Sequence, residues 1–251
     1  GCDVVIEASG QMKPTAALQA YLDQGVKRVV VTAPVKEAGV LNVVMGVNDH
    51  LFDPASHRIV TAASCTTNCL APIVKVVHEN LGIRHGSITT VHDLTNTQSI
   101  PDQPHQDLRR ARAAAANIIP TKTGAAAAVG IVLPQLKGKV DGFALRVPTI
   151  NVSLVDLTFT AGRATTKDEI NALMTAAANG PLKGVMDVNN EPLVSSDFNH
   201  TTVSSTFDAT QTRVIQGEDG STLVKVLAWY DNEWGYSCRM LDAARTWMSV
   251  K

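Results

Sequence analysis

Up to about residue 64, short apolar runs alternate with one amphipathic segment. Short apolar runs lie at the centre of residues 3–9 (Val4-Val5-Ile6) and 27–33 (Val29-Val30-Val31) and through most of residues 59–63, and apolar positions recur at helical spacing over residues 14–23. Continuous apolar runs are typical of strands that are buried on both faces, and strands joined through helices pair in parallel. This part of the chain therefore predicts a parallel β-sheet of an α/β arrangement.

The pattern changes after residue 65, where longer segments alternate polar and apolar residues. Four such segments predict strands with one covered face, over residues 86–92, 141–147, 152–160 and 223–230. Helical spacing predicts helices over residues 107–117, 124–135, 167–178 and about 234–250. Thr166 should cap the third helix, with Glu169 at capping-box spacing. We therefore expect a second, α+β part with a mixed or antiparallel sheet and flanking helices.

The two parts meet at the run Ala-Ala-Ser-Cys-Thr-Thr-Asn-Cys, residues 62–69. A strand-like segment leads into it and a helix-like segment, residues 70–81, follows it. Ser64 is a favoured N-cap residue, so Cys65 should lie in the first helical turn, where free N–H groups favour thiolate over thiol. A free cysteine is also a common packing residue, and that alternative stays open for Cys65 on this pattern alone.

The bulk composition narrows the class of protein. The chain has 251 residues, 45% of them hydrophobic and 18% charged, and a net charge of −1, so we expect neither nucleic-acid nor membrane partners. Four cysteines in a chain of this length do not form a disulfide framework, which favours a reducing, cytoplasmic location. No apolar run reaches membrane length.

Several residues could assist the thiol. His92 ends a strand, and imidazole is well suited to deprotonate a thiol near neutral pH, although a histidine at a strand end is often structural. Residues 121–124 (Thr-Lys-Thr-Gly) open an Ala-rich helix and offer N–H and hydroxyl groups to an anion. Arg146 ends a strand and could bind a phosphate. A solvated basic face is the alternative for the nearby arginines Arg109, Arg110 and Arg112. Together these residues suggest acyl chemistry on a phosphorylated aldehyde.

Five motifs resemble one enzyme family. Residues 63–72 (Ala-Ser-Cys-Thr-Thr-Asn-Cys-Leu-Ala-Pro) look like the active-site signature of phosphorylating glyceraldehyde-3-phosphate dehydrogenase. The resemblance continues in the same order through residues 107–113, 119–126, 145–153 and 229–237, over essentially the whole chain. It implies the C-terminal part of an NAD-binding Rossmann-type domain over residues 1–64, a catalytic domain over residues 65–230, and a helix over residues 231–251 that returns to the nucleotide domain.

The resemblance also implies a mechanism. Cys65 would attack glyceraldehyde 3-phosphate to form a hemithioacetal, and His92 would take the hydroxyl proton while hydride passes to NAD or NADP. The Cys65 N–H and the His92 imidazole would stabilise the oxyanion. Inorganic phosphate would then release the thioester as 1,3-bisphosphoglycerate. The family assembles as a homotetramer, and the resemblance implies the same here.

By position in the family motifs, each matching residue receives a role. The substrate's own phosphate would be held by Thr95 and Arg146. The attacking phosphate would be held by Ser64, Thr66, Thr123 and Gly124, with Arg110 nearby. The cofactor cleft would be lined by Ser9, Gly10 and Thr32, whereas Asn232 would contact the nicotinamide amide and Tyr236 would pack near the nicotinamide ring. Cys69 matches the family's second cysteine, which is structural, and no metal is implied.

The chain departs from the family pattern at its start. The family opens with a Gly-rich dinucleotide fingerprint and an acidic residue for the ribose, and this sequence begins where the fourth strand of the nucleotide domain begins. Loss of strands 1–3 would leave residues 4–8 as an unpaired apolar edge. We therefore expect the isolated polypeptide to bind NAD poorly and to have little or no activity.

A second departure follows the base. The stretch His-Asp-Leu-Thr-Asn-Thr-Gln, residues 92–98, resembles a subgroup found with arsenic-resistance transporters, in which arsenate replaces phosphate as the attacking anion. A carboxylate at Asp93 would raise the imidazole's pKa if it faced the site, but strand alternation predicts that it points away. Residues 146–153 and 197–200 instead resemble ordinary proteobacterial members and the erythrose-4-phosphate dehydrogenase branch.

Three alternatives stay open at this point. The first is erythrose-4-phosphate dehydrogenase, which shares the fold and the thiol. The second is a metal-binding or redox module built on Cys65, Cys69 and His92, although Cys-x₃-Cys plus one histidine supplies only three ligands. The third is a non-catalytic remnant. The sequence does not decide between NAD and NADP.

Overall fold

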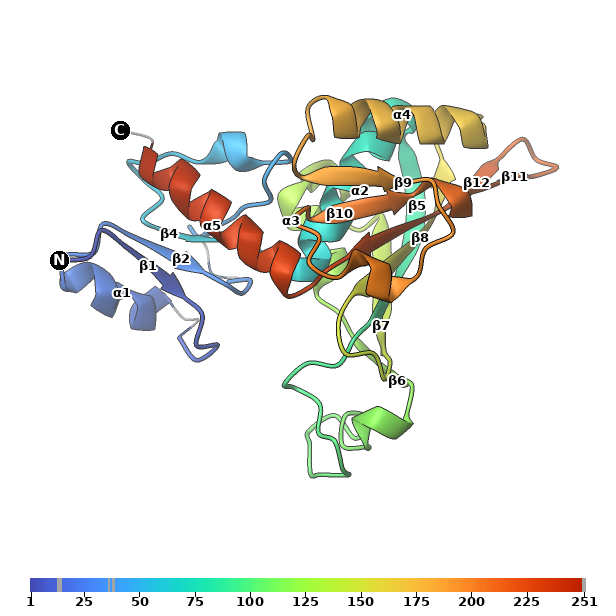
Figure 1. Cartoon of the computed structure of the whole chain (residues 1–251). Helices are drawn as coiled ribbons and strands as arrows, with labels where there is room; N and C mark the ends of the chain where they lie inside the picture. Colours follow the sequence, from blue (N-terminus) through green and yellow to red (C-terminus); the bar gives the residue numbers. More distant parts are fainter. Residues whose placement is uncertain (13–14, 36, 38, 250–251) are drawn as a thin grey trace.

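The computed structural model describes residues 1–12, 15–35, 37 and 39–249, which form two β-sheets with helices packed against them (Figure 1). Among these residues, no helix combines the length and the apolar character needed to cross a membrane.

Four short parallel strands form the first sheet, in the order β1–β2–β4–β3. Their bounds are Val4–Glu7 (β1), Arg28–Val31 (β2), Leu41–Asn42 (β3) and Ile59–Thr61 (β4). Helix α1 (Thr15–Asp23) covers one face with Leu18, and helix α5 (Trp234–Ser249) covers the other with Trp247. Burial on both faces explains the continuous apolar runs. The predicted parallel sheet is confirmed, with β3 as an additional strand and β1 at the edge.

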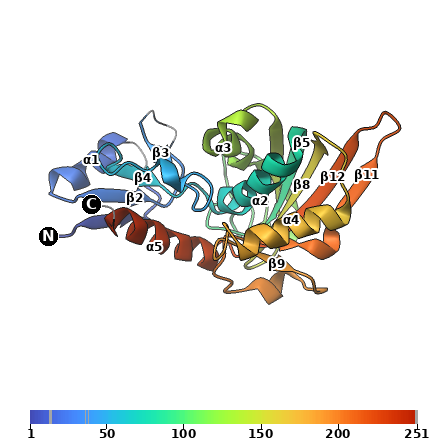
Figure 2. The same cartoon turned by 90° about the horizontal axis from the view of Figure 1, so that it is seen from above.

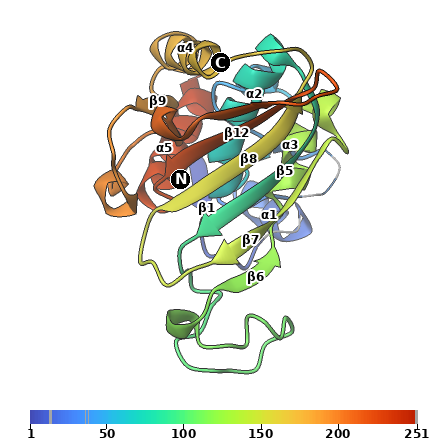
Figure 3. The ribbon, with the colours of Figure 1, turned by 90° about the vertical axis from the view of Figure 1, so that its right-hand side faces the viewer.

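Eight strands form the second sheet, in the order β6–β7–β5–β8–β12–β10–β9, with β11 paired to β12 (Figure 3). Their bounds are Ile83–His92 (β5), Ile119–Lys122 (β6), Val140–Arg146 (β7), Ser153–Ala161 (β8), Met186–Asn189 (β9), Ser205–Asp208 (β10), Arg213–Gln216 (β11) and Thr222–Tyr230 (β12). The β5–β7 and β9–β10 pairs are parallel and the others antiparallel. The predicted mixed sheet is confirmed.

Three helices cover one face of the second sheet: α2 (Cys65–Leu81), α3 (Ala125–Val132) and α4 (Lys167–Asn179) (Figure 2). Helix α2 is the central one, and it is buried along most of its length. Because β5 and β7 are parallel and pair His92 with Arg146, their carboxyl ends meet at one edge of the sheet. The α2 N-terminus lies at the same edge, so a thiol, an imidazole and a guanidinium converge there.

Helix α5 links the two sheets. It follows β12 and runs back to the first sheet, where Trp247 packs with Val30 and Val60 (Figure 1). The predicted helix start at Trp234 is confirmed, while Val250 lies outside the described residues. The domain boundaries that the sequence suggested at residues 64 and 230 stay a prediction.

The helix predicted over residues 107–117 is wrong. These residues form turns and one short 3-10 helix, Ala114–Ala116, within the long loop that projects between β5 and β6 (Figures 1 and 3). Side chains replace helical bonding here: the Asp107 carboxylate accepts from the Arg109 N–H, and the Asp102 carboxylate accepts from the Ala113 N–H. Aspartate side chains compete with helical hydrogen bonding in this way.

Two helix ends also differ from the prediction. Helix α3 stops at Val132 and a 3-10 turn, Pro134–Leu136, follows, because proline cannot continue an α-helix. At the start of α4, Thr166 accepts from the Glu169 N–H at 3.2 Å as predicted. The Glu169 carboxylate, however, binds Arg163 and Thr165, so the reciprocal half of the capping box does not form.

Candidate active site

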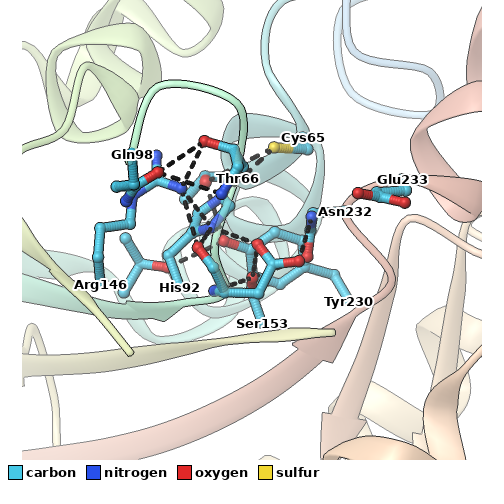
Figure 4. Close-up of polar contacts among 12 residues, drawn as sticks. Cys65, Thr66, His92, Gln98, Arg146, Ser153, Tyr230, Asn232 and Glu233 are labelled. Carbon is cyan, nitrogen blue, oxygen red and sulfur yellow. Dashed lines mark hydrogen bonds and ion pairs between the residues drawn. The ribbon is translucent and has the colours of Figure 1, made fainter. Parts of the chain in front are cut away.

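A thiol and an imidazole lie side by side where α2 begins and β5 ends. Sγ of Cys65 is 3.8 Å from Nε2 of His92 (Figure 4). Ser64 forms the N-cap, since its Oγ accepts from the N–H of Thr67 at 3.1 Å. Ala63 has a positive φ of 56°, which turns the chain sharply from β4 into the helix. The predicted cap and helix start are confirmed.

The imidazole of His92 is buried and held from several sides. Its Nδ1 lies 2.7 Å from Oδ1 of Asp93, 3.0 Å from the Asp93 carbonyl oxygen and 2.9 Å from Nη1 of Arg146. Burial lowers the pKa of His92, and Arg146 lowers it further. Hydrogen bonds with Asp93 and Cys65, and the charge of Cys65, outweigh both and raise the pKa to about 9. At 3.8 Å, this imidazole is placed to exchange a proton with the sulfur of Cys65.

The prediction that Asp93 points away from the site is wrong. Side chains alternate between faces only within a strand, and β5 ends at His92. Beyond that residue the chain turns, and the Asp93 N–H bonds to Oγ of Ser153 instead of continuing the ladder. The carboxylate is fully buried and turned back toward the imidazole.

A cavity of about 270 Å³ opens beside the thiol. It is lined by eight predicted site residues, Ser64, Cys65, Thr66, His92, Arg110, Thr123, Gly124 and Arg146. Thr95 joins them through Arg146, whose Nη1 donates to its Oγ1 at 3.3 Å. The structure therefore brings all the predicted catalytic and phosphate-binding residues together.

The cavity is suited to an anion. Burial and the nearby charge of Arg110 lower the pKa of Arg146, so two guanidiniums repel each other across it. Nε of Arg146 is also buried without a hydrogen-bond partner among the described residues. An anion between the two arginines would offset the repulsion and satisfy that donor.

The sequence of this site and its surroundings matches a known family. A profile described as glyceraldehyde 3-phosphate dehydrogenase, C-terminal domain, matches residues 64–232. The chain belongs to the glyceraldehyde-3-phosphate dehydrogenase family. The family consists of NAD(P)-dependent oxidoreductases that act on aldehydes.

Curated relatives agree with this assignment. Over 98% of this chain and 72% of the relative, it is 54% identical to glyceraldehyde-3-phosphate dehydrogenase 3 of Nostoc sp.. Over 97% of this chain and 71% of the relatives, it is 56% identical to the plasmid-encoded enzyme of Cupriavidus necator and 53% identical to the enzyme of Geobacillus stearothermophilus.

The predicted cofactor residues of this family member fall in two places. Ser9, Gly10 and Thr32 follow the carboxyl ends of β1 and β2, the edge where open parallel sheets bind dinucleotides. Gly10 has a φ of +74°, and a Cβ there would meet open space, so a ligand can approach the backbone. These residues therefore fit a dinucleotide.

The other two cofactor residues lie nearer the thiol. The Tyr236 hydroxyl donates to the Ala63 carbonyl oxygen at 2.9 Å, at the turn that precedes the Cys65 helix. Asn232 is buried, and its carboxamide bonds to Ser153 and Asp93 (Figure 4). Each end of that carboxamide keeps one further hydrogen-bonding position, so the group fits a nicotinamide amide.

Sequence reasoning missed several contributors to the site. Pro34, Thr90, Lys122 and Ala144 complete the cavity wall. Lys122 lies in a segment already linked to anions, and its place on β6 next to the cavity was the missing information. Tyr230 lies within the motif of residues 229–237 and received no role of its own from the sequence, although alternation along β12 turns it inward.

Cys69 does not belong to the cavity. Its Sγ lies 3.5 Å from Oγ of Ser205 and 3.8 Å from the Ala228 carbonyl oxygen, inside the core. Burial raises the pKa of Cys69 to about 12, so it stays a thiol. Within the described part of the chain, no cluster of three His, Cys, Asp or Glu side chains is arranged to hold a metal ion. This geometry does not fit the module of Cys65, Cys69 and His92.

Proposed function

We propose that the protein oxidises glyceraldehyde 3-phosphate to 1,3-bisphosphoglycerate through a thioester on Cys65. The observation that supports it best is the single cavity that combines a thiol, an imidazole 3.8 Å away and two arginines. The names of the relatives from Nostoc, Cupriavidus and Geobacillus point to the same reaction.

The residues divide the chemistry as follows. The Cys65 thiolate attacks the aldehyde carbon, and Nε2–H of His92 donates its proton to the oxygen, which gives a hemithioacetal. NAD(P) supplies the hydride acceptor for the carbon–hydrogen bond. As that bond breaks, neutral His92 takes the hydroxyl proton back and a thioester forms. A phosphate oxygen then attacks the thioester carbon, the carbon–sulfur bond breaks, and the Cys65 thiolate returns with the acyl phosphate released.

Two groups of residues bind the two phosphates in this proposal. Arg146 and Thr95, which bond to each other, hold the phosphate of the substrate. The attacking anion is held by Ser64, Thr66, Arg110, Thr123 and Gly124. Arsenate has nearly the same shape and charge as phosphate, so these residues accept either anion. Ser9, Gly10 and Thr32 hold the nucleotide part of NAD(P), and Asn232 and Tyr236 orient the nicotinamide.

A steady-state assay of NADH formation tests the proposal. Glyceraldehyde 3-phosphate with phosphate or arsenate should give turnover when NAD(P) is bound, and the Cys65→Ser variant should give none. Because the missing Gly-rich fingerprint leads us to expect weak NAD binding, a thermal-shift titration with NAD(P) precedes the assay. Erythrose 4-phosphate is the competing substrate, and faster turnover of it without dependence on phosphate would favour erythrose-4-phosphate dehydrogenase. Absence of turnover with both aldehydes would overturn the proposal if the protein is folded, binds NAD(P), and has a Cys65 thiol that a separate sample shows to react with iodoacetamide.

We further propose a homotetramer in the cytoplasm. Five large apolar side chains are exposed on the projecting loop, on β7 and just beyond β7, where other copies of the chain would cover them: Ile100, Leu108, Ile118, Phe143 and Ile150. A neighbouring hollow of about 710 Å³ shares Phe143 in its wall. Sedimentation velocity measures the assembly, and a monomer at micromolar concentration would contradict it. The four free cysteines support a reducing compartment.

A further inference from the structure

The carboxylate of Asp93 lies behind the active-site imidazole and has two short contacts. Its Oδ1 is 2.7 Å from Nδ1 of His92, and its Oδ2 accepts from Nδ2 of Asn232 at 2.9 Å. Nothing of the side chain is exposed to solvent. A buried carboxylate persists only where donors compensate its charge, so both contacts matter to its presence.

Ser153 closes a ring of hydrogen bonds with these groups. Its Oγ accepts from the Asp93 N–H at 3.1 Å and donates to Oδ1 of Asn232 at 2.8 Å (Figure 4). The single hydroxyl proton is therefore used on Asn232, and its 3.4 Å approach to Oδ1 of Asp93 supplies no proton. The same bond fixes which end of the Asn232 carboxamide faces Asp93.

The hydrogen bonds among Asp93, Ser153 and Asn232 determine which nitrogen of the His92 imidazole carries the proton. Because the Ser153 hydroxyl donates its proton to Asn232, the donor nearest to Oδ1 of Asp93 is Nδ1–H of His92. Arg146 also approaches Nδ1, but its Nη1 donates to the Asp93 carbonyl oxygen at 3.0 Å and to Thr95. A proton on Nδ1 leaves Nε2 to exchange protons at the sulfur of Cys65.

We infer that Asp93 is a positioning residue that keeps His92 in the Nδ1–H tautomer and, through the same carboxylate, orients the carboxamide of Asn232. The role of Asp93 in holding the His92 tautomer is argued from the contacts alone, whereas the role of Asn232 toward the nicotinamide rests on the proposed function. One side chain thereby sets the directions of both the proton acceptor and the group on the cofactor side.

The backbone next to Ser153 indicates that surrounding contacts fix the position of its hydroxyl. Val152 is buried and has a φ of +71°. A β-branched residue in that conformation is strained, and strain of this kind persists where surrounding contacts over-determine the geometry. The strained residue sets the start of β8, and with it the position of the Ser153 hydroxyl.

Four ionisable groups face His92 from the elements packed around it. They are Cys65 from α2, Asp93 after β5, Arg146 from β7 and Tyr230 from β12. Burial raises the pKa of Tyr230 well above its usual value, so it stays neutral. Cys65 and Asp93 favour the imidazolium and Arg146 opposes it, which makes the Asp93 carboxylate one of two groups that keep the proton on His92.

Nitrogen-15 NMR of the histidines in the wild-type full chain tests the inference without any substrate. A His92→Gln spectrum assigns the His92 signals, and the pattern of proton correlations identifies which nitrogen carries the proton in the neutral ring. We expect Nδ1–H. A neutral His92 with Nε2–H would overturn the inference, whether or not any variant folds.

Two variants sharpen the test. In Asp93→Asn, Asn232 still donates to residue 93, so the new amide must donate to Nδ1, and we expect the tautomer to switch to Nε2–H. The double variant combines Asp93→Asn with Asn232→Asp. The carboxylate at position 232 then accepts from the amide N–H of residue 93, so the amide oxygen of residue 93 faces His92 and accepts from Nδ1–H. We therefore expect the original tautomer to return. An unchanged tautomer in the single variant, or no return in the double variant, contradicts the inference. Asp187→Asn, an exposed β9 change, is the matched control.

Kinetics then separate the inference from the proposed function. In Asp93→Asn we expect kcat to fall on the order of 10²-fold, with the KM for the aldehyde unchanged, because Asp93 positions the base and does not contact substrate. Wild-type protein that shows Nδ1–H and binds NAD(P) but oxidises no aldehyde would remove the proposed function and leave the inference standing. A kcat equal to that of Asp187→Asn, with the tautomer switched, would show that positioning by Asp93 has no catalytic effect and would overturn its functional part.

Discussion

The hydroxyl of Tyr230 lies 2.9 Å from Oγ1 of Thr66 and so joins the end of β12 to the first turn of α2, beside Cys65. The same hydroxyl is 2.9 Å from Oγ1 of Thr90 on β5. All three oxygens are in the buried interior, and the ring of Tyr230 meets His92 edge-on at 6.0 Å. One phenol thus connects the elements that carry the nucleophile and the base.

Replacing Tyr230 with phenylalanine should destabilise the protein by about 1–2 kcal/mol, because two buried threonine hydroxyls lose a partner. Urea unfolding measures the change. If the hydroxyl acts through Thr90, then Thr90→Val should cost about 1 kcal/mol less in the Tyr230→Phe background than in the wild type. Equal costs in both backgrounds would show that the two hydroxyls are not coupled.

The local chemistry of the nucleophile was readable from the sequence. Ser64 is a capping residue directly before Cys65, and capping depends on neighbours in the chain, so the helix start was predicted correctly. The contacts of Tyr230 could not be read from the sequence, because Thr66 is 164 residues away and only the packing of α2 against β12 brings the two together.

The wrong predictions for Asp93 and for residues 107–117 show where periodicity in the sequence stops predicting structure. A strand's alternation predicts a side chain's direction only up to the strand's last residue, and the sequence does not mark that residue to within one position. Helical spacing over residues 107–117 was misleading because Asp102 and Asp107 bind loop N–H groups with their carboxylates. Periodicity of apolar residues predicts structure only where those residues are buried, and few side chains of this exposed loop are buried.

The four cysteines should differ in their reaction with iodoacetamide. Cys65 is partly exposed beside an imidazolium, and we expect it to be alkylated rapidly in the native protein. Cys69 is buried with its pKa raised to about 12, so it should react only after urea unfolding. Mass spectrometry of the peptides distinguishes the sites, with exposed Cys2 as the internal reference. Native labelling of Cys69 at the rate of Cys2 would contradict its placement in the core.

The stability of the protein should depend on pH through His92. Its pKa is raised to about 9 in the folded state, above the ordinary 6.5, so the folded protein binds this proton more tightly than the unfolded chain. The stabilisation is fully present below pH 6.5 and is lost as the pH rises through 9, and its size is on the order of 3 kcal/mol.

Urea unfolding of the wild type and of His92→Gln across this range measures that contribution as a difference between the two proteins. The wild-type advantage should shrink as the pH rises. An advantage that stays constant, or grows, would mean that the imidazole is not held as an imidazolium.

Arg146 should recognise the phosphate of the substrate. It is half-buried at the end of β7, and its Nε is buried and has no partner among the described residues. A hydrogen bond to a charged group contributes about 1.5–3 kcal/mol, so Arg146→Gln should raise the KM for glyceraldehyde 3-phosphate on the order of 10- to 10²-fold. The KM for unphosphorylated glyceraldehyde should hardly change, because that substrate has no phosphate to lose. Arg112→Gln, at an exposed pair with Asp102, is the control and should leave both constants as they are. An equal loss with both aldehydes would assign Arg146 to holding His92 and Asp93 in place instead of the substrate.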